Sequence, residues 1–378
     1  MVHLPPYLDP NEDLLLLNAM YVAPYYEESE SGRKKKVAND YLYLVYRDRR
    51  TGEKRLKQIE DPQVATFITK PEKRGSFKTQ RKFLPINDVD MYQVPYSRIT
   101  TFVRNIIKED GRDLDYLPVT EKAPKEAFKW RNAYYSDYNI VDYAMITYLL
   151  NNKKYQESEG DTIGNLSVSK AFLDIESDVY GLTTVEMDEG RGPINAVSVV
   201  ISYDKFGVKL DHPQVYTFLL RNHARYKEQE YFEANLDKFI DECHAEFDAK
   251  YHEPEFIINI YDYEKDLLRA LFRMLHAKSP DFILIWNMGY DIPKMISRLI
   301  YLGEDPKYYF CHKDFKRHMC QYNYDNVFKN DFKNKTESFD CTSYSMWVDQ
   351  MLNYAGINLV PVHGDVFEKK IYLIAGKS

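Results

Sequence analysis

The sequence predicts an α/β domain, in which helices flank a mixed sheet, preceded by a strand-rich α+β domain. In the first part of the chain, segments rich in Tyr and Val are separated by polar stretches and turns, which is typical of strands. After residue 165, three strand-like segments precede a helix, a strand and a second helix, the order of an α/β domain. The polar run 151–165 contains two glycines and predicts the boundary. We therefore expect domains at 1–165 and 166–355 and a tail at 356–378.

The first domain is expected to contain three strands and two helices. The strands are placed at 19–26, 41–47 and 54–59, and the helices near 97–108 and 138–152. An apolar stripe on each helix is expected to face the core. The stripes are Phe102, Val103, Ile106 and Ile107 in the first helix, and Val141, Met145, Ile146, Leu149 and Leu150 in the second.

Two basic segments of this domain have two interpretations each. Arg33 to Lys36 lies in the polar stretch between the first two strands, and the segment 70–82 is basic around Phe77. Such charge blocks are typical of solvated surface loops. They also suit contacts with a nucleic-acid backbone, where an aromatic ring can stack on a base.

The second domain is expected to contain five strands and two helices. The strands are placed at 166–175, 195–203, 214–220, 256–260 and 281–286, the last being typical of a fully covered central strand. A helix capped by Asp262 follows the fourth strand, and another follows the fifth. Their apolar faces are Leu267, Leu268, Leu271, Phe272 and Leu275, and Ile292, Met295, Ile296, Leu299 and Ile300.

The composition excludes several classes of protein. Hydrophobic residues make up 44% and charged residues 29% of the chain, as in globular domains. No apolar run approaches the roughly 20 residues of a transmembrane helix, and the N-terminus does not resemble a signal peptide. Four cysteines do not suggest a disulfide framework, so we expect a reducing compartment, the cytoplasm. The net charge of −7 argues against a nucleic-acid coat, although acidic clusters that hold cations reverse the local field.

The first group of chemical interest is the pair Asp174 and Glu176, which follows Phe172-Leu173. On a strand, residues two apart point to the same face. Two carboxylates on one face of a strand repel each other, and a bound cation removes that repulsion. The alternative is an ordinary surface pair, because Asp-x-Glu at a strand end is common.

The second group is Asn287-Met288-Gly289-Tyr290-Asp291, which leaves an apolar strand and enters a helix. A carboxylate at Asp291 suits a helix start, where it caps backbone amides. The alternative role is a metal ligand at the carboxyl end of a strand, where α/β sheets place their sites. The amide of Asn287 is suited to a sugar or phosphate oxygen.

Together these two groups resemble the Exo I and Exo II motifs of DEDD-type exonucleases, in which Asp-x-Glu precedes Asn-x-x-Tyr-Asp by about a hundred residues. The surrounding sequence resembles phage-type family B DNA polymerases over residues 167–354. The segments that carry this resemblance are 260–268, Pro280, Asp291-Ile292-Pro293, and 338–340 with the helix after it. The N-terminal domain is more loosely similar, through 45–48 and 52–54. The resemblance implies an RNase H-like exonuclease domain.

The resemblance also implies a chemistry, which is two-metal hydrolysis of the 3'-terminal phosphodiester of DNA in a viral replication protein. Asp174, Glu176 and Asp291 are then both catalytic residues and ligands of two divalent cations, Mg²⁺ or Mn²⁺. Asn287 and Tyr290 are expected near the terminal nucleotide. Ser177, the residue after the Exo I glutamate, is expected to contact the frayed single-stranded end.

The third motif of that family, Tyr-x-x-x-Asp, has no good match in the sequence. Tyr301 and Asp305 have the spacing, but they follow the far end of the Exo II helix, about 15–20 Å from the site. The His-x-x-x-x-Asp variant occurs at His276 and Asp281, before Exo II and therefore out of order. The given sequence ends at Ser378, before the position beyond Asp340 at which we expect the third motif, and it contains no polymerase motif.

Two explanations of the missing motif remain open. The chain is either one subunit of a split polymerase, with Exo III and the polymerase domain on a second chain, or a truncated product. In both cases we expect poor exonuclease activity from the chain alone. The alternative function is a non-catalytic DNA-binding or assembly subunit that docks on a separate polymerase chain. An RNase H-like nuclease of another kind, such as a resolvase, lacks the Asn-x-x-Tyr-Asp motif.

A cluster of possible zinc ligands occurs at Cys311, His312, His318 and Cys320. Thiolate and imidazole are the side chains that zinc prefers. The spacing matches no common zinc finger or ribbon, so an ordinary loop is the competing interpretation.

Overall fold

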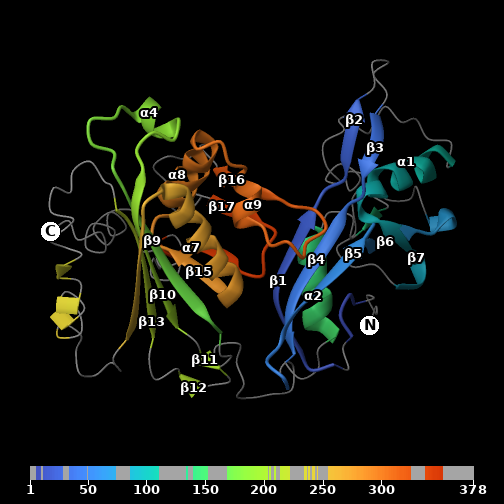
Figure 1. Ribbon diagram of the computed structural model, residues 1–378. Helices are drawn as coiled ribbons and strands as arrows, with labels where there is room; N and C mark the ends of the chain where they lie inside the picture. Colours follow the sequence, from blue (N-terminus) through green and yellow to red (C-terminus); the bar gives the residue numbers. More distant parts are fainter. Residues whose placement is uncertain are drawn as a thin grey trace, which may run out of the picture. The chain divides into compact units, whose positions relative to one another are not determined.

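The computed structural model contains two compact units, residues 1–164 and 165–378 (Figure 1). The boundary region 152–165, the basic segment beyond residue 73 and the tail 356–378 lie outside the described residues. The residues that the structure describes are 6–9, 12–28, 34–48, 50–73, 86–109, 133–134, 139–151, 168–202, 204–205, 208–209, 213–221, 234–235, 237–238, 241–242, 245, 254–324 and 337–351.

The first unit is rich in strands, as predicted. Its strands form an antiparallel sheet in the order β1-β4-β5, a sheet in the order β7-β6-β8, and the hairpin β2-β3. The bounds are β1 (Leu14–Val22), β2 (Tyr25–Glu28), β3 (Lys34–Ala38), β4 (Tyr41–Asp48), β5 (Lys54–Glu60), β6 (Gln63–Thr69), β7 (Val89–Pro95), β8 (Ala133–Tyr134), α1 (Ile99–Glu109) and α2 (Ile140–Asn151). Short 3₁₀ turns lie at Pro71–Lys73, Ile86–Asp88 and Tyr96–Arg98.

The basic run between β2 and β4 is partly engaged within the molecule. The Lys36 ammonium lies 2.7 Å from a carboxylate oxygen of Asp61 and 3.4 Å from one of Asp40. This favours a structural role for Lys36 over a contact with DNA. Arg33 lies outside the described residues.

The face that α2 buries is not the predicted one. Met145, Leu149 and Leu150 are exposed, so the predicted stripe is wrong. The helix is apolar on nearly all sides, and periodicity therefore cannot select a face. Tertiary contacts select it instead, and the Tyr143 hydroxyl accepts a hydrogen bond from the amide of Ala65 at 3.3 Å. The buried residues of α2 are Ile140, Tyr143, Ala144 and Thr147.

The second unit is built on a six-stranded mixed sheet in the order β14-β13-β10-β9-β15-β18. The strands β9, β10 and β13 are antiparallel neighbours, whereas β13–β14, β9–β15 and β15–β18 are parallel pairs. The bounds are β9 (Lys170–Ser177), β10 (Ile194–Ser202), β13 (Gln214–Leu220), β14 (Glu255–Tyr261), β15 (Phe282–Ile285) and β18 (Met346–Asp349). Two small pairs are β11 (Asp204–Lys205) with β12 (Val208–Lys209), and β16 (Cys320–Tyr324) with β17 (Glu337–Cys341).

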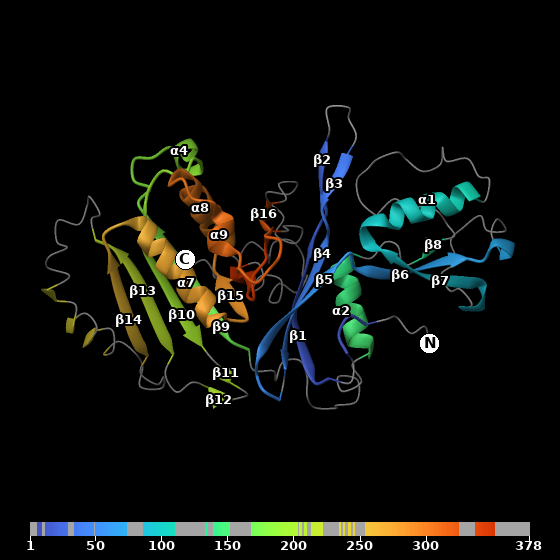
Figure 2. The ribbon, with the colours of Figure 1, turned by 45° about the vertical axis from the view of Figure 1, so that its right-hand side comes forward.

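The helices of this unit are α4 (Thr184–Asp188), α7 (Glu264–Lys278), α8 (Met288–Tyr301) and α9 (Pro306–Phe310). Figures 1 and 2 show α7 and α8 on the same face of the sheet. The core lies between these helices and the sheet. It is formed by alternate residues of the strands, such as Leu173, Ile175 and Val199, and by the predicted apolar faces of the helices. None of the described helices has the length and apolar character needed to cross a membrane.

Two local predictions for this unit are wrong, and a third is incomplete. Ile300 is exposed rather than part of the buried face of α8. Asp262 does not cap α7, because its carboxylate pairs with Arg221 at 2.8 Å and the cap position is Tyr263. The segment 338–340 lies in β17, and a further strand of the central sheet, β18, comes before any helix. That strand was not anticipated.

Candidate functional site

The strand β9 presents two carboxylates on one face, as the Asp-x-Glu spacing predicts. Leu173 and Ile175 are buried in the core, and Asp174 and Glu176, which alternate with them, are exposed on the opposite face. The strand is central in the sheet, with β10 on one side and β15 on the other. Both acids lie just beyond the part of β9 that pairs with β15 and are held by their pairing with β10.

The second group lies at the same edge of the sheet. Since β9 and β15 are parallel, with Leu173 opposite Ile285, the turn that follows Ile285 lies beside the carboxyl end of β9. This turn consists of Trp286 and Asn287, both exposed, and α8 begins at Met288. The parallel pairing thus brings together two motifs that are far apart in the sequence.

Asp291 lies within the first turn of α8 and not at its cap. The cap residue is Asn287, whose carbonyl accepts a hydrogen bond from the Asp291 amide at 3.2 Å, so Asp291 does not occupy the cap position. The Asp291 side chain is only 4% exposed. The amino end of a helix favours a carboxylate at this position.

The electrostatic environment of Asp291 is unfavourable for its charged form. Burial and the carboxylate of Asp174, with smaller effects of Asp349 and Glu176, raise the pKa of Asp291 to about 7. The carboxylates of Asp174 and Glu176 are therefore near enough to Asp291 to disfavour its charged form. A buried group whose pKa is shifted by like charges is a typical feature of a functional site.

Two of the predicted substrate contacts meet across the edge of the sheet. The hydroxyls of Ser177, at the end of β9, and Tyr290, in α8, are 2.8 Å apart and hydrogen bonded. Both side chains are accessible to solvent. The Asn287 side chain is also exposed and makes no capping hydrogen bond to α8. It is thus available to another polar group.

The three acids supply only oxygen donors, which suit Mg²⁺ or Mn²⁺. Within the part of the chain that the structure describes, no three His, Cys, Asp or Glu side chains lie close enough together to hold a cation. The donor chemistry of the group nevertheless fits a divalent cation of this kind.

Sequence reasoning missed Asp349, the fourth acid of this region. It ends β18, is buried, and accepts a hydrogen bond from the Met288 amide at 3.2 Å. The available signal was an apolar run, Met346 to Val348, that ends in Asp, because Phe172-Leu173-Asp174 has the same pattern. Its partner could not be identified without the parallel pairing of β15 and β18.

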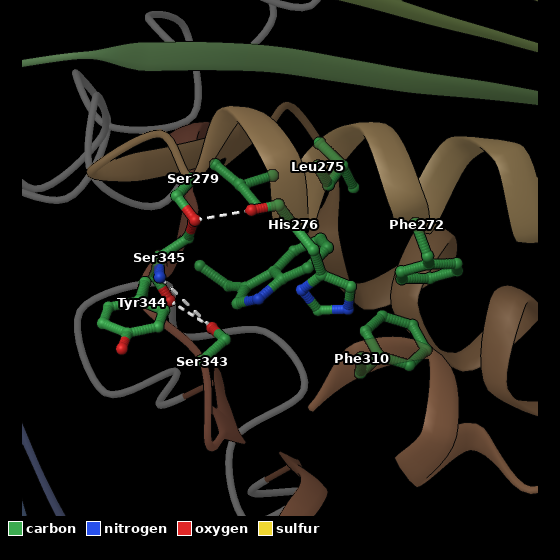
Figure 3. Close-up of a pocket in the computed structure, with 10 residues that line it drawn as sticks. Phe272, Leu275, His276, Ser279, Phe310, Ser343, Tyr344 and Ser345 are labelled. Carbon is green, nitrogen blue, oxygen red and sulfur yellow. Dashed lines mark hydrogen bonds between the residues drawn. The ribbon is translucent and has the colours of Figure 1, made fainter. Parts of the chain in front are cut away.

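The rejected matches to a third motif lie elsewhere. Asp305 caps α9 by accepting a hydrogen bond from the Lys307 amide. Asp281 lies at the opposite end of β15 and accepts from the Ser169 amide at 2.9 Å. The His276 ring donates a hydrogen bond to the carbonyl of Tyr309. The same ring lines a small pocket between α7 and the turn 343–345, whose apolar walls include Phe272 and Phe310 (Figure 3).

The cysteines and histidines near residue 315 make contacts with the protein itself. The Cys311 thiol donates to the Met319 carbonyl at 3.1 Å, and the His312 ring lies 3.4 Å from the Asp314 carboxylate. No group of three metal-binding side chains forms among the described residues of this region. These contacts favour the interpretation of the cluster as an ordinary loop.

The comparison with known families decides the identity of the second unit. The model of the family "DNA polymerase family B, exonuclease domain" matches residues 144–350, more than half of the chain. The chain belongs to this family. No match was found among curated proteins.

The family membership confirms the predicted resemblance to exonuclease domains of family B DNA polymerases and the predicted fold. The mixed sheet with its flanking helices has the α/β RNase H-like fold of these exonuclease domains. The matched residues contain β9, α8 and β18, and hence all the acids described above. Nuclease activity in general, DNA as the substrate and a requirement for divalent cations are properties of this family.

Proposed function

We propose that the chain is a 3'→5' exonuclease that removes the terminal nucleotide of a DNA strand, in the proofreading role of a phage-type replicative polymerase. Asp174, Glu176 and Asp291 are the proposed ligands of two divalent cations, Mg²⁺ or Mn²⁺. Ser177, Asn287 and Tyr290 are the proposed contacts with the terminal nucleotides. The observation that carries the proposal is the parallel pairing of β9 and β15, which brings Asp174, Glu176 and the buried Asp291 to one edge of the sheet in a domain of this family.

The proposed reaction is the hydrolysis of one phosphodiester bond. The oxygen of a water molecule attacks the terminal phosphorus, and the bond to the 3' oxygen breaks. The products are a nucleoside 5'-monophosphate and a strand that ends in a 3'-hydroxyl. Bound cations would lower the pKa of the attacking water and stabilise the leaving 3' oxygen.

The residues of the chain would prepare this reaction in two ways. Asp291 would be ionised beside a bound cation, because the positive charge would oppose the local field that raises the pKa of this carboxyl. Asp174 and Glu176, on a central strand, and Asp291, in α8, would together hold the cations. The hydrogen-bonded pair of Ser177 and Tyr290 offers hydroxyls to the sugar and phosphate of the frayed end.

The given sequence contains no suitable third motif, Tyr-x-x-x-Asp, so Asp174, Glu176 and Asp291 are the proposed ligands that it supplies. A two-metal site that lacks one carboxylate should bind at least one cation weakly. We therefore expect slow digestion by the chain alone with either Mg²⁺ or Mn²⁺.

The test is digestion of a 5'-labelled single-stranded oligonucleotide in the presence of Mg²⁺ or Mn²⁺. The intact chain is compared with Asp174→Asn and with Asp262→Asn, which changes an exposed carboxylate in a surface ion pair of little energetic value. The proposal expects a ladder that shortens from the 3' end, lost in Asp174→Asn and kept in Asp262→Asn. Digestion that is equal in all three proteins would contradict the proposed site.

The same experiment separates the exonuclease from a non-catalytic subunit. A protein that binds the oligonucleotide but leaves it intact at every Mn²⁺ concentration would support the DNA-binding or assembly role. Its binding should then be unchanged by Asp174→Asn, because no step would depend on that carboxylate.

A further inference from the structure

The carboxylate of Asp349 is buried directly beneath the start of α8. The strand β18 is parallel to β15, and Asp349 is opposite Ile285, the last residue of β15. Along β18 the burial alternates, so that Trp347 and Asp349 are buried. Asp349 therefore projects from the sheet at the level at which the chain leaves β15 and enters α8.

Two hydrogen bonds connect the end of β18 to this turn. The Met288 amide, the first of α8, donates to a carboxylate oxygen of Asp349 at 3.2 Å. The Met351 amide donates to the Trp286 carbonyl, also at 3.2 Å. Asn287, which occupies the cap position, makes no side-chain capping bond. The capping group of α8 is thus supplied by a residue more than sixty positions away.

The location of Asp349 explains the use of a charged group in the core. The first amides of a helix need acceptors, and the helix dipole favours an anion there. A buried carboxylate without such partners is costly. Asp349 has an amide at hydrogen-bond distance and a helix amino end above it. These interactions offset the cost of its burial and its repulsion from Asp291.

We propose that Asp349 is a positioning residue of the nuclease, which fixes the turn 286–288 and thereby holds Asp291 opposite Asp174. This inference rests on the proposed function, since it takes Asp291 as a metal ligand. Asp349 itself acts through Met288 and touches neither cation nor DNA. Misplacement of a reacting group by about 1 Å can reduce a rate roughly a hundredfold, so a fixed turn has a large effect on activity.

The chain offers a matched control in Asp281, at the other end of β15. Both carboxylates are buried, and each accepts a hydrogen bond from the main chain of a neighbouring segment, Asp281 from Ser169 and Asp349 from Met288. The replacements Asp281→Ala and Asp349→Ala therefore remove similar interactions. Only Asp349 is next to the proposed site.

The experiment measures three properties of Asp349→Ala, Asp349→Asn and Asp281→Ala in the intact chain. They are Mn²⁺ affinity by electron paramagnetic resonance, the rate of digestion at saturating oligonucleotide, and hydrogen exchange in peptides covering 286–291. Asp349→Asn keeps an oxygen acceptor for the Met288 amide, although it lacks the charge.

We expect Asp349→Ala to weaken Mn²⁺ binding and to slow digestion by at least about tenfold, with faster exchange at 286–291. Asp349→Asn should recover most of the lost rate. Asp281→Ala should lower the melting temperature by a similar amount while changing affinity and rate less than about threefold. Equal effects of the two alanine variants on affinity and rate would overturn the inference.

The outcome remains decisive if the proposed function fails. If the unaltered chain binds no Mn²⁺ and digests no DNA, the proposed function is contradicted and hydrogen exchange alone decides the role of Asp349. Faster exchange at 286–291 in Asp349→Ala, but not in Asp281→Ala, supports positioning of the turn. The same exchange in both variants contradicts it.

Discussion

The carboxyl group of Asp291 is buried near other carboxylates, at the amino end of α8. In the cation-free protein, burial and the carboxylate of Asp174 raise its pKa to about 7. The unfolded chain has an ordinary carboxyl pKa, so the folded state binds the extra proton between about pH 4 and pH 7. The contribution of Asp291 to stability is therefore complete below its unfolded pKa and is lost as the pH rises to about 7.

This fall in stability with rising pH gives a prediction for Asp291→Asn. An amide cannot ionise, so the variant avoids the cost of a buried charge above pH 7. We expect it to raise the melting temperature of the cation-free chain at pH 8 and to have a much smaller effect at pH 4. Thermal melts in a chelator measure both, with Asp262→Asn as the exposed control. A lower melting temperature of Asp291→Asn at pH 8 would contradict the environment described for this carboxyl.

A second residue-scale prediction concerns the hydroxyl pair. Tyr290→Phe removes the hydrogen bond to Ser177 without leaving a buried polar group, because both side chains reach solvent. The melting temperature should change by less than about 2 °C, since exposed substitutions alter stability by roughly 0.5 kcal/mol or less. The KM for the oligonucleotide should rise about three- to tenfold, as expected when a hydrogen bond of about 1 kcal/mol is lost. Steady-state kinetics of digestion measure the KM of Tyr290→Phe. An unchanged KM and rate would show that the Tyr290 hydroxyl does not contact the substrate.

At the scale of elements, sequence patterns predicted helices well where their periodicity was strong. The buried faces of α7 and most of α8 are the predicted ones, because apolar residues recur on one side only. The face of α2 was predicted wrongly, because apolar residues surround that helix and its neighbours decide the orientation. The capping of α8 by Asp349 could not be predicted from sequence patterns either, because it depends on the parallel pairing of strands that are distant in the sequence.

The loop that follows β9 is tied to α8 by a close backbone approach. A Cβ at Gly190 would lie 2.2 Å from the Ser297 carbonyl oxygen, and φ is +81°. Arg298, paired with Glu264, also donates to the Gly190 carbonyl at 3.0 Å. The loop with α4 is therefore anchored on the helix that carries Asp291.

Gly181 provides a control for this anchoring, because its φ is +77° and nothing lies within 4 Å of a Cβ added there. Gly181→Ala should cost about 1–2 kcal/mol from backbone strain alone. Gly190→Ala should cost about 1–3 kcal/mol more, because it also forces the loop away from α8. Urea unfolding of the two variants measures the difference. Equal losses of stability would show that the close approach at Gly190 is not maintained in solution.

At the scale of the whole molecule, the site is assembled by the order of the strands. Asp174 and Asp291 are more than a hundred residues apart, and the parallel pairing of β9 with β15 joins them. The motif spacing was sufficient to predict these two groups, because each lies on an element with its own pattern. The strand β18 and its acid were not predictable, since a run of four residues has little periodicity.

The most direct test of the account is a Mn²⁺ titration of the intact chain and of Asp174→Asn, Asp291→Asn and Asp262→Asn, followed by electron paramagnetic resonance. If Asp174 and Asp291 belong to one cation site, either substitution should weaken binding by at least about tenfold, and Asp262→Asn should leave it unchanged. Equal Mn²⁺ binding by all four proteins, or none by the intact chain, would contradict a shared cation site on β9 and α8.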